Sequence, residues 1–314
     1  MEIDENLRLN FYETMLTIRQ FEYKIVEFAR QGKIYGSVHL CVGEEAAAVG
    51  SCFALKETDY LLPTHRGHGQ VISKGSDIKT LLSEVAAKET GVCKGRVGSM
   101  HFFDKSKNVL GGQGVLGAQF PIAIGTGLAI KLKEQKSIVA CYFGDGTSNQ
   151  GTFYEGLNFA DIFDLPIFYI CVNNLYGMGT KYENTCNVSV IKKAQLFNLK
   201  TDSADGNDVE EVYEKSLKLA EYIRKNNRPA LIELYTYRHL GHSALDSRPY
   251  RPKEEIEEWM KKDPIKRYED KLTKKGTNPS VLEEIKKRVE NKISEAEKFT
   301  LESSFPEFTN DMEI

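Results

Sequence analysis

The segment 138–179 constrains the fold of this chain more than any other stretch. It opens with an apolar run, Ile138 to Phe143, that is rich in β-branched and aromatic residues and ends at Gly-Asp-Gly. Such a run is typical of a buried parallel strand that ends at a ligand-binding turn. A second apolar run, Ile167 to Val172, leads in the same way into Asn173 and Asn174.

A helix is predicted between these two strands. Thr152 can cap it, and the Leu165-Pro166 dipeptide stops it. The apolar residues that recur at helical spacing are Phe153, Leu157, Ala160 and Phe163. The segment is therefore a βαβ unit, whose polar groups gather at the carboxyl ends of two parallel strands. Open α/β sheets bind their ligands at that edge.

The residues at those strand ends suit a magnesium ion bound to a diphosphate. Mg²⁺ prefers a near-octahedral shell of hard oxygens and keeps phosphate oxygens as partners. Asp145, Asn174 and the backbone carbonyl near Tyr176 supply a carboxylate, an amide oxygen and a carbonyl. Glycines at 144 and 146 let the backbone approach a diphosphate, so we expect Gly146 and Thr147 beside it. The alternative is structural: a helix-capping aspartate and an ordinary turn asparagine.

Gly-Asp-Gly followed by twenty-six residues (147–172) and Asn-Asn resembles the thiamine diphosphate signature. Neighbouring stretches resemble the alpha subunit of 2-oxo acid dehydrogenases, the pyruvate and acetoin dehydrogenase alpha-subunit family. They follow the family's order over nearly the whole chain. These stretches are HLCVGEEAAAVG (39–50), THRGHG (64–69), GRVGSMHFFD (95–104), GGQGVLGAQFP (111–121), SNQGTFYEGLNFA (148–160) and YRHLGHS (237–243).

The resemblance implies the thiamine-diphosphate-binding fold, a mostly parallel, doubly wound α/β sheet with helices on both faces. It assigns the cofactor diphosphate to His65 and Arg66. It assigns the aminopyrimidine ring to the backbone at Gly114 and Leu116. It also implies that His39 lies near the substrate and that His242 lines the active site. We take His242 as the main acid–base candidate, because histidine titrates near neutrality without a large shift.

Other interpretations of these segments are weaker. His65 with His68, and His239 with His242, have a spacing that could bind zinc, but glycines inside both segments disfavour a helix. The glycine-rich stretch 91–120 contains a GxGxxG pattern at 112–117 that would indicate a nicotinamide enzyme. The residues before it, DKSKNVLG, are polar and do not predict a buried strand.

Composition limits the remaining possibilities. At 314 residues the chain can bury a large α/β core, and we expect a single domain over 1–314. A net charge of -3 makes nucleic acid an improbable partner. The six cysteines form no CxxC pair and favour a reducing compartment. The N-terminus is acidic and no apolar run approaches a membrane span, so we expect a cytoplasmic protein without membrane contact.

The remaining segments are predicted to have mainly a structural role. We expect an amphipathic helix over 7–31, a polar turn over 202–208, a helix over 209–226 and a strand over 230–235. From about 253 to 303 a charged helical tail follows, with helices over 254–262 and 279–298. Small residues along the helix after Pro121 permit close packing, in the core or across a subunit interface. Ser243 and Ser247, where mitochondrial relatives are phosphorylated, are taken as plain loop hydroxyls.

The resemblance also implies a function and a partner. The chain would be the alpha subunit of a heteromeric enzyme that uses thiamine diphosphate and Mg²⁺. It would decarboxylate a pyruvate-like 2-oxo acid or cleave acetoin, and pass the acyl group to a lipoyl-bearing acyltransferase. In the family a beta subunit supplies the glutamate that activates the pyrimidine ring. We therefore expect an α₂β₂ assembly with its active site at the α/β interface, and an inactive lone chain.

Two alternatives to this function remain open from the sequence. A split transketolase-type carboligase would share the cofactor half and transfer a two-carbon unit to an aldehyde acceptor. A non-catalytic scaffolding relative would keep the fold without binding cofactor. Glu45 or Glu155 could replace the beta-subunit glutamate, but their neighbours match the alpha pattern, in which such residues cap or buttress helices.

Overall fold

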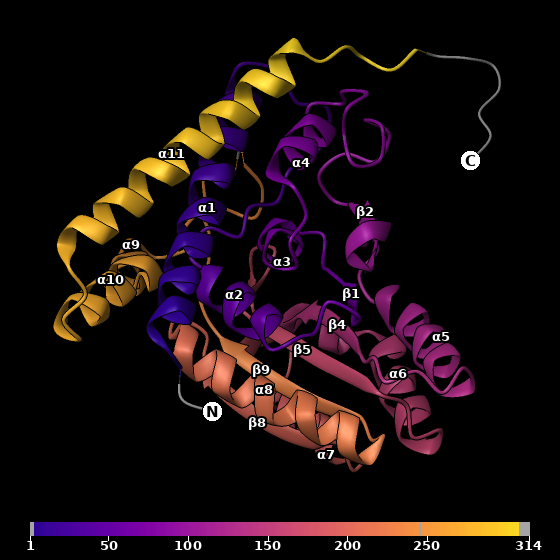
Figure 1. The fold of residues 1–314 in the computed structure, drawn as a ribbon. Coiled ribbons are helices and arrows are strands. Elements are labelled where there is room, and N and C mark those ends of the chain that lie inside the picture. Colours follow the sequence, from indigo (N-terminus) through magenta and orange to yellow (C-terminus); the bar gives the residue numbers. More distant parts are fainter. Residues whose placement is uncertain (1–2, 245, 308–314) are drawn as a thin grey trace.

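The computed structural model describes residues 3–244 and 246–307, and in these ranges a seven-stranded sheet lies between two layers of helices (Figure 1). The strand order is β2-β3-β1-β4-β5-β9-β8, and every neighbouring pair is parallel except β2 and β3. The strands are β1 (Tyr60–Leu62), β2 (Phe103–Asp104), β3 (Val109–Leu110), β4 (Val139–Gly144), β5 (Ile167–Asn173), β8 (Lys200–Asp205) and β9 (Ala230–Tyr235). The predicted fold class is confirmed.

Helices cover both faces of this sheet. One layer consists of α5 (Gln119–Leu132), α6 (Gly151–Ile162) and α7 (Val190–Gln195). The other contains α1 (Glu5–Arg30), α2 (Glu45–Phe53), α3 (His68–Ser73), α4 (Ile78–Val85), α8 (Val209–Asn226), α10 (Pro264–Lys274) and α11 (Pro279–Glu302). Side chains of β4 alternate between the layers: Tyr142 packs under α2, and Phe143 packs with α5 and α6.

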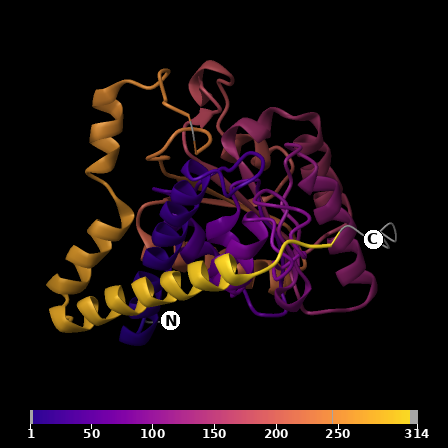
Figure 2. The same cartoon turned by 90° about the horizontal axis from the view of Figure 1, so that it is seen from above.

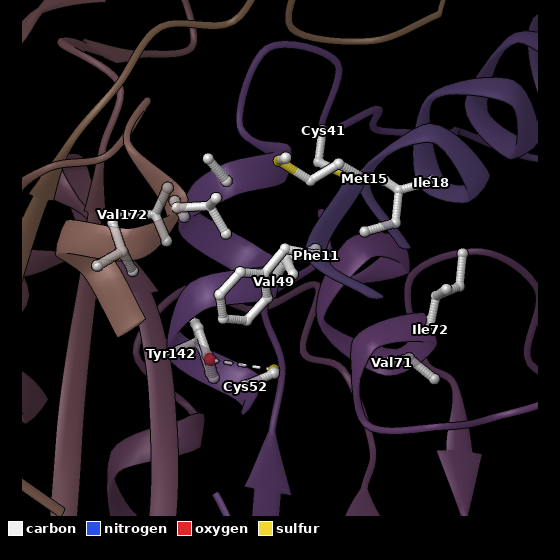
Figure 3. Packing of buried hydrophobic residues seen from close by; sticks show 14 of the residues in the cluster. Phe11, Met15, Ile18, Cys41, Val49, Cys52, Val71, Ile72, Tyr142 and Val172 are labelled. Carbon is white, nitrogen blue, oxygen red and sulfur yellow. Dashed lines mark hydrogen bonds between the residues drawn. The ribbon is translucent and has the colours of Figure 1, made fainter. Parts of the chain in front are cut away.

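The core under α2 joins distant parts of the chain. Val49 of α2, Phe11 of α1 and Tyr142 of β4 meet there (Figure 3). The Tyr142 hydroxyl lies 2.7 Å from Ser51 Oγ and 3.2 Å from Cys52 Sγ, so its polar end is satisfied inside the core. This packing fixes α2 against the centre of the sheet, next to the carboxyl end of β4.

The chain ends fold onto one another. Helix α11 runs beside α1 and α4 on the outside of the molecule (Figures 1 and 2). Its buried stripe includes Ile285, Val289, Ile293 and Ala296, and the opposite face is charged. No helix among the described residues is long and apolar enough to cross a membrane.

The predicted βαβ unit is present as β4, α6 and β5, but its helix begins differently. Gln150, not Thr152, is the N-cap residue, and it makes no side-chain capping bond. A 3₁₀ turn, Asp145–Asn149, connects the strand to the helix. Thr152 therefore lies within the first helical turn, and the predicted cap is wrong.

Three more predictions about local structure are wrong. Residues 202–205, predicted as part of the polar turn over 202–208, belong instead to the edge strand β8, whose polar side chains are mostly partly exposed. Helix α10 was missed; Asp263 caps it by accepting hydrogen bonds from the amides of Ile265 and Lys266. The residues before the GxGxxG pattern include a two-residue strand, β3, and are not wholly irregular. Helix α9 (Lys253–Met260) lies close to the predicted range of 254–262.

Glu210 ties α8 to α10. Its carboxylate lies 2.7 Å from Lys271 Nζ and 3.1 Å from Lys275 Nζ, and it accepts a hydrogen bond from the Tyr268 hydroxyl. Although burial opposes ionisation, the two lysines lower the pKa of Glu210 to about 2. The ionised carboxylate is therefore stabilised by the folded state.

We expect Glu210→Gln to lower the free energy of unfolding at pH 7 by on the order of 1 kcal/mol, since the lysines are partly exposed. The folded pKa lies below the ordinary value of 4.5, so this stabilisation is present above that pH and is lost towards about pH 2. Urea unfolding from pH 7 to pH 2 measures it. Glu214→Gln, on the exposed face of the same helix, is the control. A deficit that does not shrink with acidity would contradict the ion-pair interpretation.

Candidate functional site

A pocket of about 330 Å³ opens at the carboxyl ends of β1, β4, β5 and β9. These parallel strands are adjacent in the sheet, so the loops that leave them meet at one edge. The pocket contains nine of the residues predicted from the sequence. They are His65, Arg66, Leu116, Asp145, Gly146, Thr147, Asn174, Tyr176 and His242.

Asp145 follows β4 directly and is almost fully buried. Its Oδ2 atom has no hydrogen-bond partner among the described residues. Burial raises the pKa of Asp145 to about 6, although Arg238 partly offsets this effect. A buried carboxylate with a free oxygen facing a pocket has the character of a metal ligand.

The turns after β4 and β5 approach one another closely. A Cβ atom on Gly146 would lie 3.3 Å from the Cα atom of Gly177, so a side chain there would press on the neighbouring turn. Asn174 and Tyr176 lie on that second turn, opposite Asp145. The glycine thus brings the three predicted oxygen donors to one side of the pocket.

Two buried arginines give the pocket positive charge. Arg66 donates to the carbonyl oxygens of Leu40, at 2.7 Å, and His242, at 3.0 Å. Arg238 donates to the Met178 carbonyl at 2.9 Å, and its Nε atom has no partner. Burial and the nearby Arg66 lower the pKa of Arg238 to about 10, which leaves it charged at neutral pH. Such a pair suits a polyphosphate anion.

Three histidines from separate segments lie beside the arginines. Their ligand atoms lie within 4.8 Å of one another, and the rings of His39 and His65 meet edge to face at 4.7 Å. Burial and the positive charge of Arg66 lower the pKa values to about 4 for His242, about 3 for His39 and about 2 for His65. All three rings are neutral at neutral pH. The adjacent arginines disfavour a metal cation here.

The zinc pairs considered from the sequence do not form. His68 begins helix α3, despite the expectation that glycines would prevent a helix there, and it is buried between Glu22 and Ser99. His239 lies 3.5 Å from Asp263, away from His242. Neither pair therefore shares a ligand position.

The loop after β9 is fixed by Asp246. Its Oδ2 atom accepts hydrogen bonds from the His242 amide, at 2.7 Å, and the Tyr250 hydroxyl. Gly241 is required because a Cβ atom there would lie 2.4 Å from the Asp246 carbonyl oxygen. On this loop Ser243 is partly exposed and Ser247 is exposed. The loop thus holds the His242 ring against both arginines.

Two of the predicted residues do not line the pocket. His39 lies behind it, in contact with the rings of His65 and His242. Gly114 packs against the ring of His101, where its Cβ would lie 3.1 Å from Cε1. The GxGxxG glycines also precede α5, which begins only at Gln119, so they do not form a helix N-terminus.

Glu44 and Arg238 line the pocket but were not assigned from the sequence. Arg238 follows the carboxyl end of β9, as His65 follows β1, and this placement was the available signal. Glu44 lies just before α2, and no local pattern distinguishes it from a helix-initiating residue. Its burial, which raises its pKa, depends on packing against the β5 end.

The unsatisfied atoms of the pocket fit thiamine diphosphate and a divalent ion. Buried atoms without partners include Asp145 Oδ2, His65 Nδ1 and Arg238 Nε. A cation would neutralise the first, and a diphosphate would accept from the other two. Leu116 adds apolar surface at the mouth of the same pocket.

Comparison with known proteins gives one consistent result. The family model described as "Dehydrogenase E1 component" matches residues 12–308. The chain is 40% identical over 309 residues to the alpha subunit of the acetoin:2,6-dichlorophenolindophenol oxidoreductase of Bacillus subtilis, covering 98% of this chain and 92% of that protein. It is 37% identical over 298 residues to a Rickettsia felis pyruvate dehydrogenase E1 component subunit alpha, covering 94% and 91% respectively. The testis-specific human mitochondrial form is 38% identical over 294 residues, covering 93% and 75%.

We expect the imidazole of His242 to stay neutral down to about pH 4 in the protein alone. Inorganic pyrophosphate should raise this pKa, because an anion between the arginines offsets their positive charge. NMR titration of ¹⁵N-histidine-labelled protein measures both values, and His242→Gln assigns the signal. A pKa near 6.5 without anion, or a decrease on anion binding, would contradict this electrostatic interpretation.

Proposed function

Because the chain belongs to the dehydrogenase E1 component family, we propose that it is the alpha subunit of a heteromeric, thiamine-diphosphate-dependent dehydrogenase. It acts on acetoin or on a pyruvate-like 2-oxo acid, as the names of its relatives suggest. One observation carries the proposal. Among the described residues, Asp145, His65 and Arg238 each have a buried polar atom without a hydrogen-bond partner, and all three line the pocket between Gly-Asp-Gly and Asn-Asn. We treat residues 1–314 as a single cofactor-binding domain and place the protein in the cytoplasm, where its buried free cysteines would stay reduced.

We propose that Asp145, Asn174 and the Tyr176 carbonyl bind Mg²⁺, which bridges to the diphosphate. His65, Arg66 and the amides of Gly146 and Thr147 would hold the diphosphate, with the backbone at Gly114 and Leu116 beside the aminopyrimidine. Arg238, which the sequence did not indicate, joins this set because its buried guanidinium lines the same pocket. When bound, thiamine diphosphate supplies an electron sink next to the substrate carbonyl.

His242 is the proposed catalytic base and acid. Its Nδ1 atom lies 3.2 Å from Arg238 and 3.5 Å from Arg66, so the neutral ring can accept a proton only when an anion offsets these charges. His39, which touches both other rings, is the second catalytic candidate. Diphosphate binding would thus prepare the histidine for proton transfer.

This pocket has no acid left to activate the pyrimidine ring. Of the described residues that line it, only Glu44 and Asp145 are acidic, and both are engaged at the proposed metal side. Glu45 forms a salt bridge with Arg19, and Glu155 is exposed on α6. Neither can replace a partner's glutamate, which supports the requirement for a beta subunit.

The outer face of α5 and α6 supports the position of that partner. Helix α5 is apolar on both sides: Ala123 and Gly127 face the core, while Leu128 and Leu132 are exposed. A helix that is apolar all round is normally buried. The exposed apolar residues of this face, which we call the α5/α6 face, are Val115, Leu116, Ile122, Leu128, Leu132, Tyr154, Phe159, Ile162 and Phe163.

This face continues to the mouth of the pocket through Leu116, which belongs to both. We propose that the beta subunit covers it in an α₂β₂ assembly and so completes the cofactor site at the α/β interface. The small residues of α5 that the sequence could assign to core or interface serve both, because Gly127 packs on Ile167 and Gly125 is open. A lipoyl-bearing acyltransferase would accept the acyl group from this assembly.

The named relatives are dehydrogenase and oxidoreductase subunits, and they give no support to the transketolase-type alternative. A scaffolding role is disfavoured because the pocket retains its charged, unpartnered atoms. The nicotinamide interpretation is disfavoured by the position of the GxGxxG glycines before α5.

We expect dye reduction with acetoin, pyruvate or a branched 2-oxo acid only when the chain is combined with a beta-subunit homologue, thiamine diphosphate and Mg²⁺. Asp145→Ala should abolish turnover through loss of the metal, and His242→Ala should lower it about 100-fold or more. Asp202→Asn, in the edge strand β8, is the control. Full turnover by the lone chain would overturn the subunit proposal; an aldehyde acceptor requirement would favour the carboligase.

We expect Ile162→Glu on α6 to weaken association with the beta subunit by more than about tenfold, because it introduces a charge into an apolar interface. Analytical ultracentrifugation of the mixed subunits measures this. Leu196→Glu is the matched control, because Leu196 is also an exposed apolar residue but lies after α7, which packs on β8 and β9. Unchanged assembly of the Ile162 variant, or equal loss in both, would exclude the α5/α6 face as the interface.

A further inference from the structure

Two buried glutamates each hold one asparagine of the pair that ends β5. Asn174 donates from Nδ2 to Glu44 Oε1 at 2.7 Å, and Asn173 donates from Nδ2 to Glu233 Oε1 at 2.8 Å. Glu44 is the residue just before α2, and Glu233 lies in the middle of β9. Neither was assigned a role from the sequence.

The bond to Glu44 determines which end of the Asn174 amide is free. In the structure the NH₂ group of Asn174 faces the Glu44 carboxylate and donates to it, so the amide carbonyl oxygen points away from Glu44. Asn174 Oδ1 then receives only the long, 3.3 Å bond from the Tyr176 amide. It keeps a lone pair for a cation, whereas the reversed amide would present an NH₂ group to the metal.

The bond to Glu233 acts on the backbone of the same turn. It leaves Asn173 Oδ1 free to accept from the Leu175 amide at 3.0 Å. Leu175 has a φ of 70°, a left-handed conformation that is unfavourable for a residue other than glycine. The asparagine bond and a bond from the Tyr182 amide to the Leu175 carbonyl hold this conformation. The carbonyl of Tyr176 is directed by the turn that results.

Packing alone does not explain why a glutamate occupies position 233. It is fully buried, and its Oε2 atom has no hydrogen-bond partner among the residues that the structure describes. Such a carboxylate destabilises a fold unless it is compensated, and an apolar side chain of similar size is often tolerated better. Its Oε1 atom accepts a hydrogen bond from the asparagine that shapes the turn.

We propose that Glu44 and Glu233 are positioning residues for the divalent ion, Glu44 by orienting the Asn174 amide and Glu233 by fixing the 173–176 turn through Asn173. This inference rests on the proposed function, because the ion is the Mg²⁺ that would bridge Asp145 to the cofactor diphosphate. Asp145, Asn174 and Tyr176 would contact the ion. The two glutamates would not contact it and would act through the asparagines.

The test replaces each glutamate in two ways. Glu44→Met and Glu233→Met keep side-chain length but remove the acceptor, while Glu44→Gln and Glu233→Gln keep an oxygen that can face the asparagine NH₂ group. Calorimetric titration of thiamine diphosphate at increasing Mg²⁺, on the chain combined with its beta subunit, gives the Mg²⁺ concentration for half-maximal binding. The Met variants should need about 10- to 100-fold more Mg²⁺, and the Gln variants should stay within about threefold of the parent.

Saturating Mg²⁺ should restore the thiamine diphosphate affinity of the Met variants, because the diphosphate contacts are unchanged. General damage to the fold would lower that affinity at every Mg²⁺ concentration. Asp59→Asn is the destabilised control: Asp59 is a buried carboxylate that bonds the Ile138 amide and Arg224, at the opposite ends of the strands. It should lower the melting temperature without changing the Mg²⁺ requirement.

If Glu233→Met does not fold, Glu233→Asp retains the charge and shortens the reach to Asn173, and it should also raise the Mg²⁺ requirement. Met variants with the parent's Mg²⁺ requirement would overturn the positioning role. Equal effects of Gln and Met would overturn the orientation argument. A parent complex that binds thiamine diphosphate without any Mg²⁺ dependence would overturn the proposed metal site itself, and the inference with it.

Discussion

Arg66, Arg238 and Asp145 are buried at one edge of the sheet, and burying such charges without compensation strongly destabilises a fold. The surrounding structure compensates them only in part. Arg66 donates to the Leu40 carbonyl, and the Arg238 guanidinium donates to the Met178 carbonyl. Among the described residues, Asp145 Oδ2 and Arg238 Nε have no hydrogen-bond partner, and both residues line the pocket, so a bound cation and a bound anion would compensate them.

The supporting layers explain how these groups are held. Helix α2 packs on Tyr142 of β4 and brings Glu44 to the end of β5, while Asp246 fixes the loop that carries His242. Each contact joins segments that are distant in the chain. Burial and the positive charge of the arginines keep the histidines neutral, so an anion bound by these arginines would make protonation of His242 more favourable.

The pocket and the α5/α6 face are two parts of one proposed site, which this chain leaves incomplete. The pocket holds groups for the diphosphate and metal but no free acid for the other end of the cofactor. Next to it, α5 presents Leu128 and Leu132 to solvent, although its composition is that of a buried helix. A partner that covers this apolar surface and brings a carboxylate would meet both needs. The two glutamates behind the Asn-Asn pair belong instead to the half of the site that this chain completes itself.

The sequence by itself determined the βαβ unit around Asp145 and the sheet's fold class, because strand and helix periodicity and the Gly-Asp-Gly and Asn-Asn ends are local signals. The family resemblance, not periodicity, indicated His65, Arg66 and Leu116, which line the pocket. It did not determine β8, since an edge strand with polar side chains lacks that periodicity. Tertiary structure alone decided that Glu44 lines the pocket and that His68 is instead buried against Glu22. Those outcomes depend on which loops meet at the sheet edge and on which residues are buried. The residues next to a given position in the sequence indicate neither.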